Sequence, residues 1–240
     1  HVALGNRVVK RRWRRISISL AVVSALALGS AVILVGTPRD LLISIATTPF
    51  ASKIINKLLQ YSLPPNDAAC LARLSKLDVE FKRQSDFSEP QGCSVENSVR
   101  LARVGRIKID NAPLLTCRMA TELHEFEEGR LQPIARRIFG AEVTRLSHLG
   151  TYSCRGMRQF KGILSQHAFA NAIDISHFVL ANGQSISVQR DWKSSSDQAR
   201  FLREVSSAAC KTFRVSVSPD GDANHWNHFH WDMGFFKSCG

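Results

Sequence analysis

The sequence predicts an α+β fold, in which helices flank an antiparallel sheet and one transmembrane helix precedes the folded domain. Three patterns lead to this prediction. Residues 16–36 form an apolar run without a charged side chain. Residues 117–139 and 197–212 repeat apolar side chains at helical spacing. After residue 140, short segments of alternating apolar and polar side chains are separated by turn residues, which is typical of strands joined by hairpins.

The N-terminal apolar run is long enough to cross a bilayer as a helix. A basic flank, residues 1–15, precedes it, so the positive-inside rule places the flank in the cytoplasm and everything after residue 36 on the far side. A cleaved signal peptide is the alternative, but the run is long for that role. We therefore expect a single-pass protein of the inner membrane whose C-terminal domain, residues 67–240, lies in the periplasm. Residues 37–66 would be a juxtamembrane linker, either a plain tether or a short amphipathic helix on the membrane.

Two helices are expected in the first half of the domain. Asn66 can cap a helix that runs through Leu77. Thr116 precedes a longer helical run that ends at Phe139, within which Pro133 starts a new turn or makes a kink. The apolar side of the longer helix comprises Leu123, Phe126, Leu131, Ile134 and Ile138.

The second half of the domain supplies the sheet and a third helix. Residues 142–148 alternate apolar and polar side chains, and residues 172–176 are expected to form a short strand. Asn182-Gly183 is a hairpin signal, because both residues tolerate the positive φ angles of a tight turn. The remaining expected elements are the hairpin over 178–188, a helix from Asp197 to about Thr212, a strand over 213–217, a turn over 218–222 and a last strand that carries the C-terminal histidines.

The charge distribution argues against a nucleic-acid partner. The chain has a formal net charge of +12, but residues 1–62 hold nine of its 32 basic and one of its 20 acidic side chains, which leaves only +4 for residues 63–240. The folded part shows neither a basic stripe nor an aromatic stacking motif, so no nucleic-acid binding is predicted. Its mild positive charge suits an anionic polymer such as a cell wall. Nothing in the sequence indicates an oligomeric state.

The six cysteines all follow the apolar run, and no two of them form a Cys-x-x-Cys pair. Wide spacing beyond an export signal indicates three disulfides in an oxidising compartment rather than a thiolate zinc site. The pairing cannot be derived from sequence, and our expectation is simple sequential pairing. The expected bridges are Cys70–Cys93, Cys117–Cys154 and Cys210–Cys239.

The segment from His225 to His230 holds three of the eight histidines of the chain. In an extended segment, side chains alternate faces, so His228 and His230 are expected on the same sheet surface. The positions expected to face the core are Phe229, Trp231 and Met233.

Asp174 is expected to place its carboxylate on the outer face of a strand in the same way, because its neighbours Ile173 and Ile175 are expected to point inward. An Asp within an apolar run costs several kcal/mol of desolvation unless it is paired or binds a metal. Two histidines and one carboxylate are a ligand set of zinc hydrolases, in which a fourth position is left for water. Ordinary hydrogen-bonded core or surface residues are the alternative interpretation.

The motif residues resemble a known group of proteins. Ser165-x-His167, followed by Asp174 and a terminal His228-x-His230, resembles the metallopeptidases that group lysostaphin-type enzymes, D-Ala-D-Ala carboxypeptidases and the hedgehog fold. The C-terminal histidine motif is similar to the end of the penicillin-insensitive murein endopeptidases. From about residue 70 to residue 239, the chain most resembles the bacterial extensin-like C-terminal domain family. The matching stretches are Cys70-Leu-Ala-Arg-Leu, Gly92-Cys93-x-Val95, Thr151-Tyr-Ser-Cys-Arg155, Leu164-Ser-x-His-Ala168, Asn171-Ala-Ile-Asp-Ile175, Ala209-Cys210 and His228-Phe-His-x-Asp232.

The resemblance implies that His167, Asp174 and His230 bind Zn2+ and that His228 is the catalytic histidine. Other members of the wider group carry Glu or Asp as general base three residues before the last ligand. That position is Asn227 in this chain, which cannot take a proton, so the role passes to His228, with His225 as second candidate.

A cationic donor is also needed for a developing oxyanion or a terminal carboxylate of the substrate. Arg155 is the candidate, because a guanidinium can hold a carboxylate with two parallel hydrogen bonds. An ordinary surface arginine is the alternative. Ser165 is expected either to orient a ligand by hydrogen bonding or to cap a turn.

The expected function is that of a zinc-dependent peptidase that hydrolyses peptidoglycan stem peptides or cross-links through a metal-activated water, as a D,D-carboxypeptidase or D,D-endopeptidase. The first alternative is a non-catalytic, zinc-containing module of the same fold that binds the cell wall or a partner. The second is a disulfide-stabilised domain without metal. Zinc content separates the last from the other two, and hydrolysis of purified muropeptides separates the enzyme from the binding module.

Overall fold

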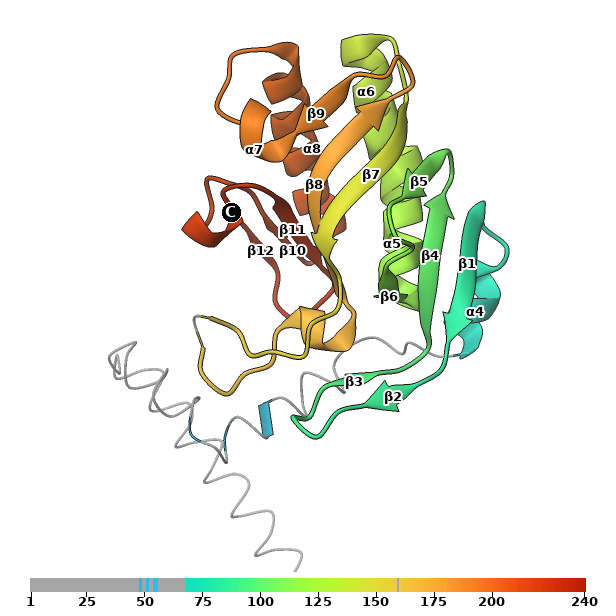
Figure 1. Ribbon diagram of the computed structural model, residues 1–240, viewed down its shortest axis with the longest axis vertical. Helices are drawn as coiled ribbons and strands as arrows, with labels where there is room; N and C mark the ends of the chain where they lie inside the picture. Colours follow the sequence, from blue (N-terminus) through green and yellow to red (C-terminus); the bar gives the residue numbers. More distant parts are fainter. Residues whose placement is uncertain (1–47, 49–50, 52–53, 56–67, 159) are drawn as a thin grey trace, which may run out of the picture. The chain divides into compact units, whose positions relative to one another are not determined.

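The computed structural model describes residues 48, 51, 54–55, 68–158 and 160–240. Its folded part is α+β, as predicted, with one large and mostly antiparallel sheet (Figure 1). The predicted cytoplasmic flank 1–15 and membrane anchor 16–36 lie outside the described residues, as does most of the linker 37–66. Among the helices that the structure describes, none combines the length and apolar composition needed to cross a bilayer.

The helices and helical turns of the domain are α4 (Ala68–Leu74), α5 (Cys117–Phe126), the π-helical turn η1 (Glu127–Leu131), α6 (Gln132–Phe139), the 3-10 turn η2 (Gln166–Phe169), α7 (Val188–Asp191), α8 (Asp197–Thr212) and the 3-10 turn η3 (Ala223–His225). The strands are β1 (Val79–Gln84), β2 (Phe87–Ser88), β3 (Ser94–Val95), β4 (Ser98–Val104), β5 (Ile107–Ile109), β6 (Leu114–Thr116), β7 (Val143–Gly150), β8 (Ala172–Leu180), β9 (Ser185–Ser187), β10 (Val215–Val217), β11 (Phe229–Asp232) and β12 (Ser238–Cys239).

Ten of the described strands form one sheet in the order β1-β4-β5-β7-β8-β11-β10-β12, with β6 paired to β4 and β9 paired to β8. Neighbouring strands are antiparallel except in the pairs β5–β7 and β10–β12. The strands β8 and β11 are neighbours in the interior of this sheet, so both are hydrogen-bonded on two sides. They provide a rigid base for the histidine and aspartate motifs.

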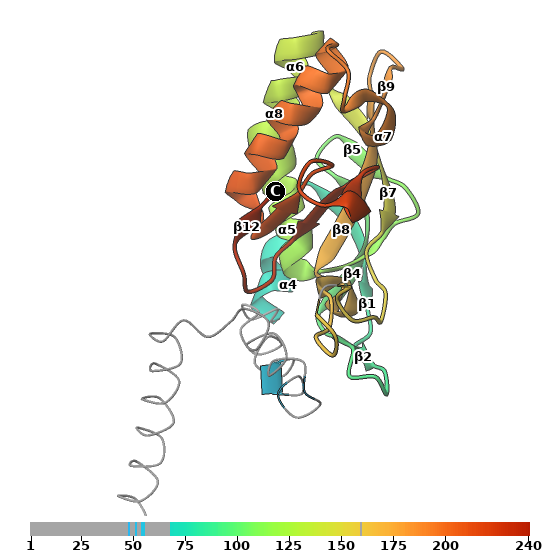
Figure 2. The ribbon, with the colours of Figure 1, turned by 90° about the vertical axis from the view of Figure 1, so that its left-hand side faces the viewer.

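The helices α5, α6 and α8 cover one face of the sheet (Figure 2). The side chains that β8 and β11 send toward them are buried, as predicted, since at most 2% of each is exposed. Because side chains alternate along a strand, Asp174 and His230 project from the opposite face, away from these helices. The buried set comprises Ile173, Ile175, Phe229 and Trp231, and Met233, which follows β11, is buried with them.

The long predicted helix over 117–139 exists, but it is interrupted. Thr116 is its N-cap, as predicted, because its hydroxyl accepts a hydrogen bond from Met119 N at 3.2 Å. The chain then passes through the π-helical turn η1 into α6, where Pro133 lies in the first turn and its missing N–H costs nothing. The first helix of the domain ends at Leu74 rather than the predicted Leu77, and its expected cap Asn66 lies outside the described residues.

In the second half, α8 has the predicted bounds, while two strand predictions need correction. Residues 172–180 form one continuous strand, β8, where a short strand and a separate hairpin strand were expected. The hairpin turn itself is present, and Gly183 has φ +83°. The strand expected from residue 213 begins at Val215.

The sequence pattern predicts that the C-terminal histidine segment is extended throughout, but the structure shows only part of it as a strand. Residues 223–225 form the turn η3, and β11 begins only at Phe229. His228 therefore lies just before the strand rather than in it, but its ring still turns to the same side as His230, because both rings lie near Asp174 Oδ1. Asp222 and Asn224 shape this turn, because the Asp222 carboxylate accepts a hydrogen bond from Asn224 N at 2.9 Å.

The disulfides are Cys70–Cys117, Cys93–Cys154 and Cys210–Cys239. Only the last of the three sequentially expected bridges is correct. Packing between elements decides the other two: α4 lies against the start of α5, and the loop after β2 packs on the loop that leads to η2. Sequence spacing carries no information about either contact.

Candidate metal centre

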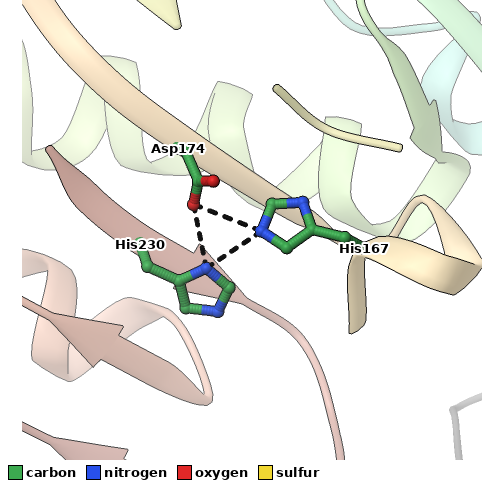
Figure 3. A group of neighbouring side chains, drawn as sticks. All are labelled: His167, Asp174 and His230. Carbon is green, nitrogen blue, oxygen red and sulfur yellow. Dashed lines mark hydrogen bonds and ion pairs between the residues drawn. The ribbon is translucent and has the colours of Figure 1, made fainter. Parts of the chain in front are cut away.

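Three side chains from different elements converge on one point: His167 of η2, Asp174 of β8 and His230 of β11 (Figure 3). His167 Nε2 lies 3.2 Å and His230 Nδ1 lies 3.0 Å from the same oxygen, Asp174 Oδ1. The two ring nitrogens are 3.2 Å apart. The structure thus brings together the three side chains that the sequence resemblance implies as ligands.

Strand register explains two of the three positions. β8 and β11 pair antiparallel with His230 directly opposite Asp174. Directly opposed residues have Cβ atoms only about 4.5–5.5 Å apart, so their side chains meet on the same face of the sheet. A slip of β11 by one residue against β8 would turn His230 into the helix-covered core and break this pairing.

His167 is positioned by a short, capped turn. Ser165 Oγ accepts a hydrogen bond from His167 N at 3.3 Å. Ser165 therefore caps the turn and positions His167 through the backbone N–H of His167. A buried network fastens this turn to the rest of the domain. Asn171 donates to Gln166 Oε1 at 2.9 Å and accepts from Thr116 Oγ1 at 3.1 Å.

The three donor atoms fit a tetrahedral ion. Zinc bonds of about 2.0–2.2 Å in a tetrahedron separate neighbouring ligand atoms by roughly 3.3–3.6 Å. The separations of 3.0–3.2 Å are close to that value, so small side-chain adjustments would admit the ion. Two imidazoles with one carboxylate favour zinc over magnesium or calcium, which prefer oxygen ligands. A fourth tetrahedral position would be left for water or substrate.

Each candidate histidine ligand has a hydrogen-bond partner on its other ring nitrogen. His167 Nδ1 lies 3.2 Å from the carbonyl oxygen of Thr151, and His230 Nε2 lies 2.9 Å from Asp232 Oδ2. Such partners fix the tautomer and the ring plane of a metal-binding histidine. They leave His167 Nε2 and His230 Nδ1 as the nitrogens that face the common point.

His228 stands beside the cluster with one ring nitrogen free to take a proton. Its Nδ1 lies 2.7 Å from Asn227 Oδ1, an atom that can only accept, so Nδ1 carries the hydrogen and donates it. Its Nε2 lies 3.6 Å from Asp174 Oδ1. Asn227, which replaces an expected acid, therefore orients the neighbouring histidine as a hydrogen-bond acceptor.

His225 lies next to His228, with 5.0 Å between ring centroids, and its centroid is 5.5 Å from that of His230. Its Nδ1 is 3.4 Å from Asp222 Oδ2. This second candidate for proton transfer is thus in the site, with its ring beside those of both His228 and His230.

The cluster opens into a cleft of about 550 Å3. Arg155 lines this cleft together with His225 and His228, so the predicted arginine shares a cavity with the predicted histidines. Phe235 and Phe236 form an apolar part of the wall although 52% and 62% of their surfaces are exposed. Exposed aromatic side chains beside polar groups are typical of ligand-binding clefts.

The family described as Extensin-like protein C-terminus matches residues 68–240. The chain belongs to this family. The match spans the sheet described above and all six candidate site residues. Comparisons with curated proteins and with solved structures each return no match.

The electrostatics of the extensin-like domain keep Asp174 ionised. Burial alone would raise the pKa of Asp174, but hydrogen bonds from His167 and His230 outweigh burial and hold the pKa well below its usual range. Burial would also lower the pKa of His230, yet its hydrogen bonds to Asp174 and Asp232 raise that pKa to about 9. In the absence of a metal, a proton on His230 takes the place of the cation.

The other two histidines of the cleft are kept neutral. Burial, together with the nearby His230 and His228, lowers the pKa of His225 to about 4. Burial also lowers the pKa of His228, against the opposite effect of Asp174. A neutral imidazole at physiological pH is able to accept a proton, which is the property that a general base needs.

Asp232 is the site residue that the sequence argument did not assign a role. It is buried, with 5% of its surface exposed, and it contacts a candidate ligand directly. The sequence could have predicted this contact, because positions two apart on a strand share a face and Asp232 follows His230 at that spacing. The contribution of Thr151 had no such signal, since it comes from a backbone carbonyl.

Proposed function

We propose that the extensin-like domain of this chain is a zinc-dependent peptidase that hydrolyses peptidoglycan stem peptides or their cross-links, as a D,D-carboxypeptidase or D,D-endopeptidase. The observation that carries the proposal is the convergence of His167 Nε2, Asp174 Oδ1 and His230 Nδ1 on one point beside a cleft that Asp174, His228 and His230 line. The order of the motifs supports kinship with the lysostaphin and D-Ala-D-Ala carboxypeptidase group.

When bound, zinc supplies a Lewis acid that polarises a carbonyl and lowers the pKa of a bound water to about 7. His167, Asp174 and His230 would hold it. His228 would accept a proton at Nε2 and return it to the leaving amine. Its Nδ1–H remains hydrogen-bonded to Asn227 throughout, so the ring keeps its orientation while the proton moves.

Arg155 would bind negative charge on the substrate. It lines the cleft, and its planar guanidinium can pair with a terminal carboxylate or with the oxygen of a scissile carbonyl as charge develops there. The exposed Phe235 and Phe236 would contact apolar parts of the stem peptide on the same wall.

We propose that the domain lies in the periplasm, where its substrate would be found. Three disulfides among the described cysteines require an oxidising compartment, which in bacteria is where the cell wall lies. The apolar run over 16–36 would hold the domain at the inner membrane, within reach of newly made peptidoglycan.

The experiment is incubation of the zinc-loaded domain with purified monomeric and cross-linked muropeptides, followed by separation and mass spectrometry. Loss of a terminal D-Ala from monomers identifies a carboxypeptidase, and conversion of dimers to monomers identifies an endopeptidase. A chelator-treated sample is the control. If a zinc-saturated, folded domain releases no product from either substrate, the peptidase proposal fails.

One observation favours a second candidate, a zinc-containing module that binds the cell wall or a partner without cleaving it. Asn227 stands where the related enzymes carry a carboxylate, so the site has one acid fewer. Binding of intact muropeptides to the zinc-loaded domain, measured by calorimetry and without products, would identify this function.

A further inference from the structure

We propose that Asp232 is a positioning residue that selects the metal-binding tautomer of His230. This inference rests on the proposed metal centre. It adds the hydrogen bond by which Nδ1 of His230, and not Nε2, would face the ion. It assigns a role to the second oxygen of a buried carboxylate whose first oxygen accepts a backbone hydrogen bond from Gly234.

The first observation is the contact itself. Asp232 Oδ2 lies 2.9 Å from His230 Nε2, and both residues belong to β11 at a spacing of two. A carboxylate can only accept a hydrogen bond, so Nε2 must carry the hydrogen. Nδ1 faces the Asp174 carboxylate at 3.0 Å, so an ion bound there would take the place of the Nδ1 hydrogen while Asp232 keeps the hydrogen on Nε2.

The second observation is that the carboxylate cannot easily rotate. Its other oxygen, Oδ1, accepts a hydrogen bond from Gly234 N at 2.8 Å. Gly234 itself packs closely against the side chain of Gln166, because a Cβ at this position would lie 2.8 Å from Gln166 Cδ. The backbone N–H thus fixes which oxygen faces Gly234 and which faces His230.

The two candidate ligands are arranged differently. His167 faces the site with Nε2 and turns Nδ1 to the neutral carbonyl of Thr151, whereas His230 faces the site with Nδ1 and turns Nε2 to a charged carboxylate. Only the second arrangement depends on a side chain that mutation can alter. A carboxylate there also adds a negative charge next to the cation, which strengthens the ring as a ligand.

This geometry makes Asp232→Asn more harmful than its size suggests. Gly234 N–H needs an acceptor, so the amide oxygen takes the place of Oδ1 and the amide NH2 takes the place of Oδ2. The NH2 group would donate to His230 Nε2 and force the hydrogen onto Nδ1, which blocks the metal position. Wrong-tautomer effects of this kind are known for histidines whose carboxylate partner becomes an amide.

The test compares zinc and cobalt affinities of the wild-type protein, Asp232→Asn and Asp232→Ala by competition with a chromophoric chelator. Asp232→Ala should weaken binding about 10–100-fold, the usual effect of losing such a partner. Asp232→Asn should weaken it at least as much, although it keeps the size and hydrogen-bonding capacity of the side chain. Asp191→Asn is the matched control, because Asp191 also accepts a backbone N–H, from Ser187 at 2.8 Å, and lies outside the cleft.

A purely structural role predicts the opposite order, since an isosteric amide disturbs packing less than a truncation. Binding by Asp232→Asn that is equal to wild type, or stronger than that of Asp232→Ala, overturns the inference. Because a variant can also misfold, nitrogen-15 spectra of zinc-loaded wild type supply a second measurement. His230 should show a protonated Nε2 and a metal-bound Nδ1, and a ring bound through Nε2 overturns the inference. Failure of the wild type to bind zinc would instead refute the metal centre on which it rests.

Discussion

At the level of single residues, some side chains of the site would hold the ion and others would transfer protons. His230 contributes to the first and His228 to the second, although only two positions separate them. The difference lies in their partners: His230 lies between two carboxylates, whereas His228 donates to the neutral amide of Asn227. Sequence pattern could place these residues near one another, but only the side-chain contacts distinguish their roles.

The two histidines should therefore respond differently to truncation. We expect His228→Ala to keep zinc and the fold but to lose about 10²–10⁴ in turnover, the usual effect of a missing general acid or base. His230→Ala should lose both zinc and activity. Elemental analysis and muropeptide turnover of both variants check this. Equal loss of zinc from the two would merge the roles assigned here, and full activity of His228→Ala would move the base to His225.

The pH dependence of the unfolding temperature should report the protonation of His230. Its pKa is raised to about 9 in the folded, zinc-free protein, above an unfolded value of about 6.5, so protonation stabilises the fold below pH 6.5 and this contribution is lost as the pH rises through 9. Thermal unfolding of zinc-free protein should give a lower midpoint at pH 9.5 than at pH 6.5. Zinc-saturated protein is the control, because the ion replaces the proton. A zinc-free midpoint that stays constant or rises over this range contradicts the assignment.

At the scale of elements, the sequence predicted what local chemistry determines. The helix α8 has the predicted bounds because its cap Ser196 and its apolar spacing agree, and the hairpin turn at Asn182-Gly183 needs only residues that tolerate positive φ. The strands over residues 79–116 had no clear pattern, since several are two or three residues long. The disulfide partners were beyond prediction for a related reason: contacts between distant elements decide them.

The bridge Cys210–Cys239 should matter for the cleft as well as for stability. It ties β12, which pairs parallel with β10, to the helix α8, and Cys239 lines the cleft. Replacement of both cysteines by serine should lower the free energy of unfolding by about 2–4 kcal/mol. Chemical denaturation measures the change, and the Cys70–Cys117 double variant is the control for a bridge outside the cleft lining. Unchanged stability in both variants would contradict a supporting role for these bridges.

At the scale of the whole molecule, the fold separates stability from chemistry. One face of the sheet is covered by α5, α6 and α8 (Figure 2) and supplies the apolar core, while Asp174 and His230, two of the candidate metal ligands, project from the opposite face. Alternation along β8 and β11 gives each strand both tasks, so Ile173 and Trp231 face the core while the ligand positions face the cleft. This division follows from strand geometry, which is why the ligand motifs could be found from the sequence.

We expect the domain to hold one metal ion through His167, Asp174 and His230. The most direct test is elemental analysis of protein purified without added metal, together with zinc titration of a chelator-treated sample. We expect close to one zinc per chain in the wild type and little or none in Asp174→Ala, which loses the carboxylate that both histidines face. Wild-type protein that takes up no zinc, or an Asp174→Ala variant that binds it as tightly as the wild type, would contradict the claim.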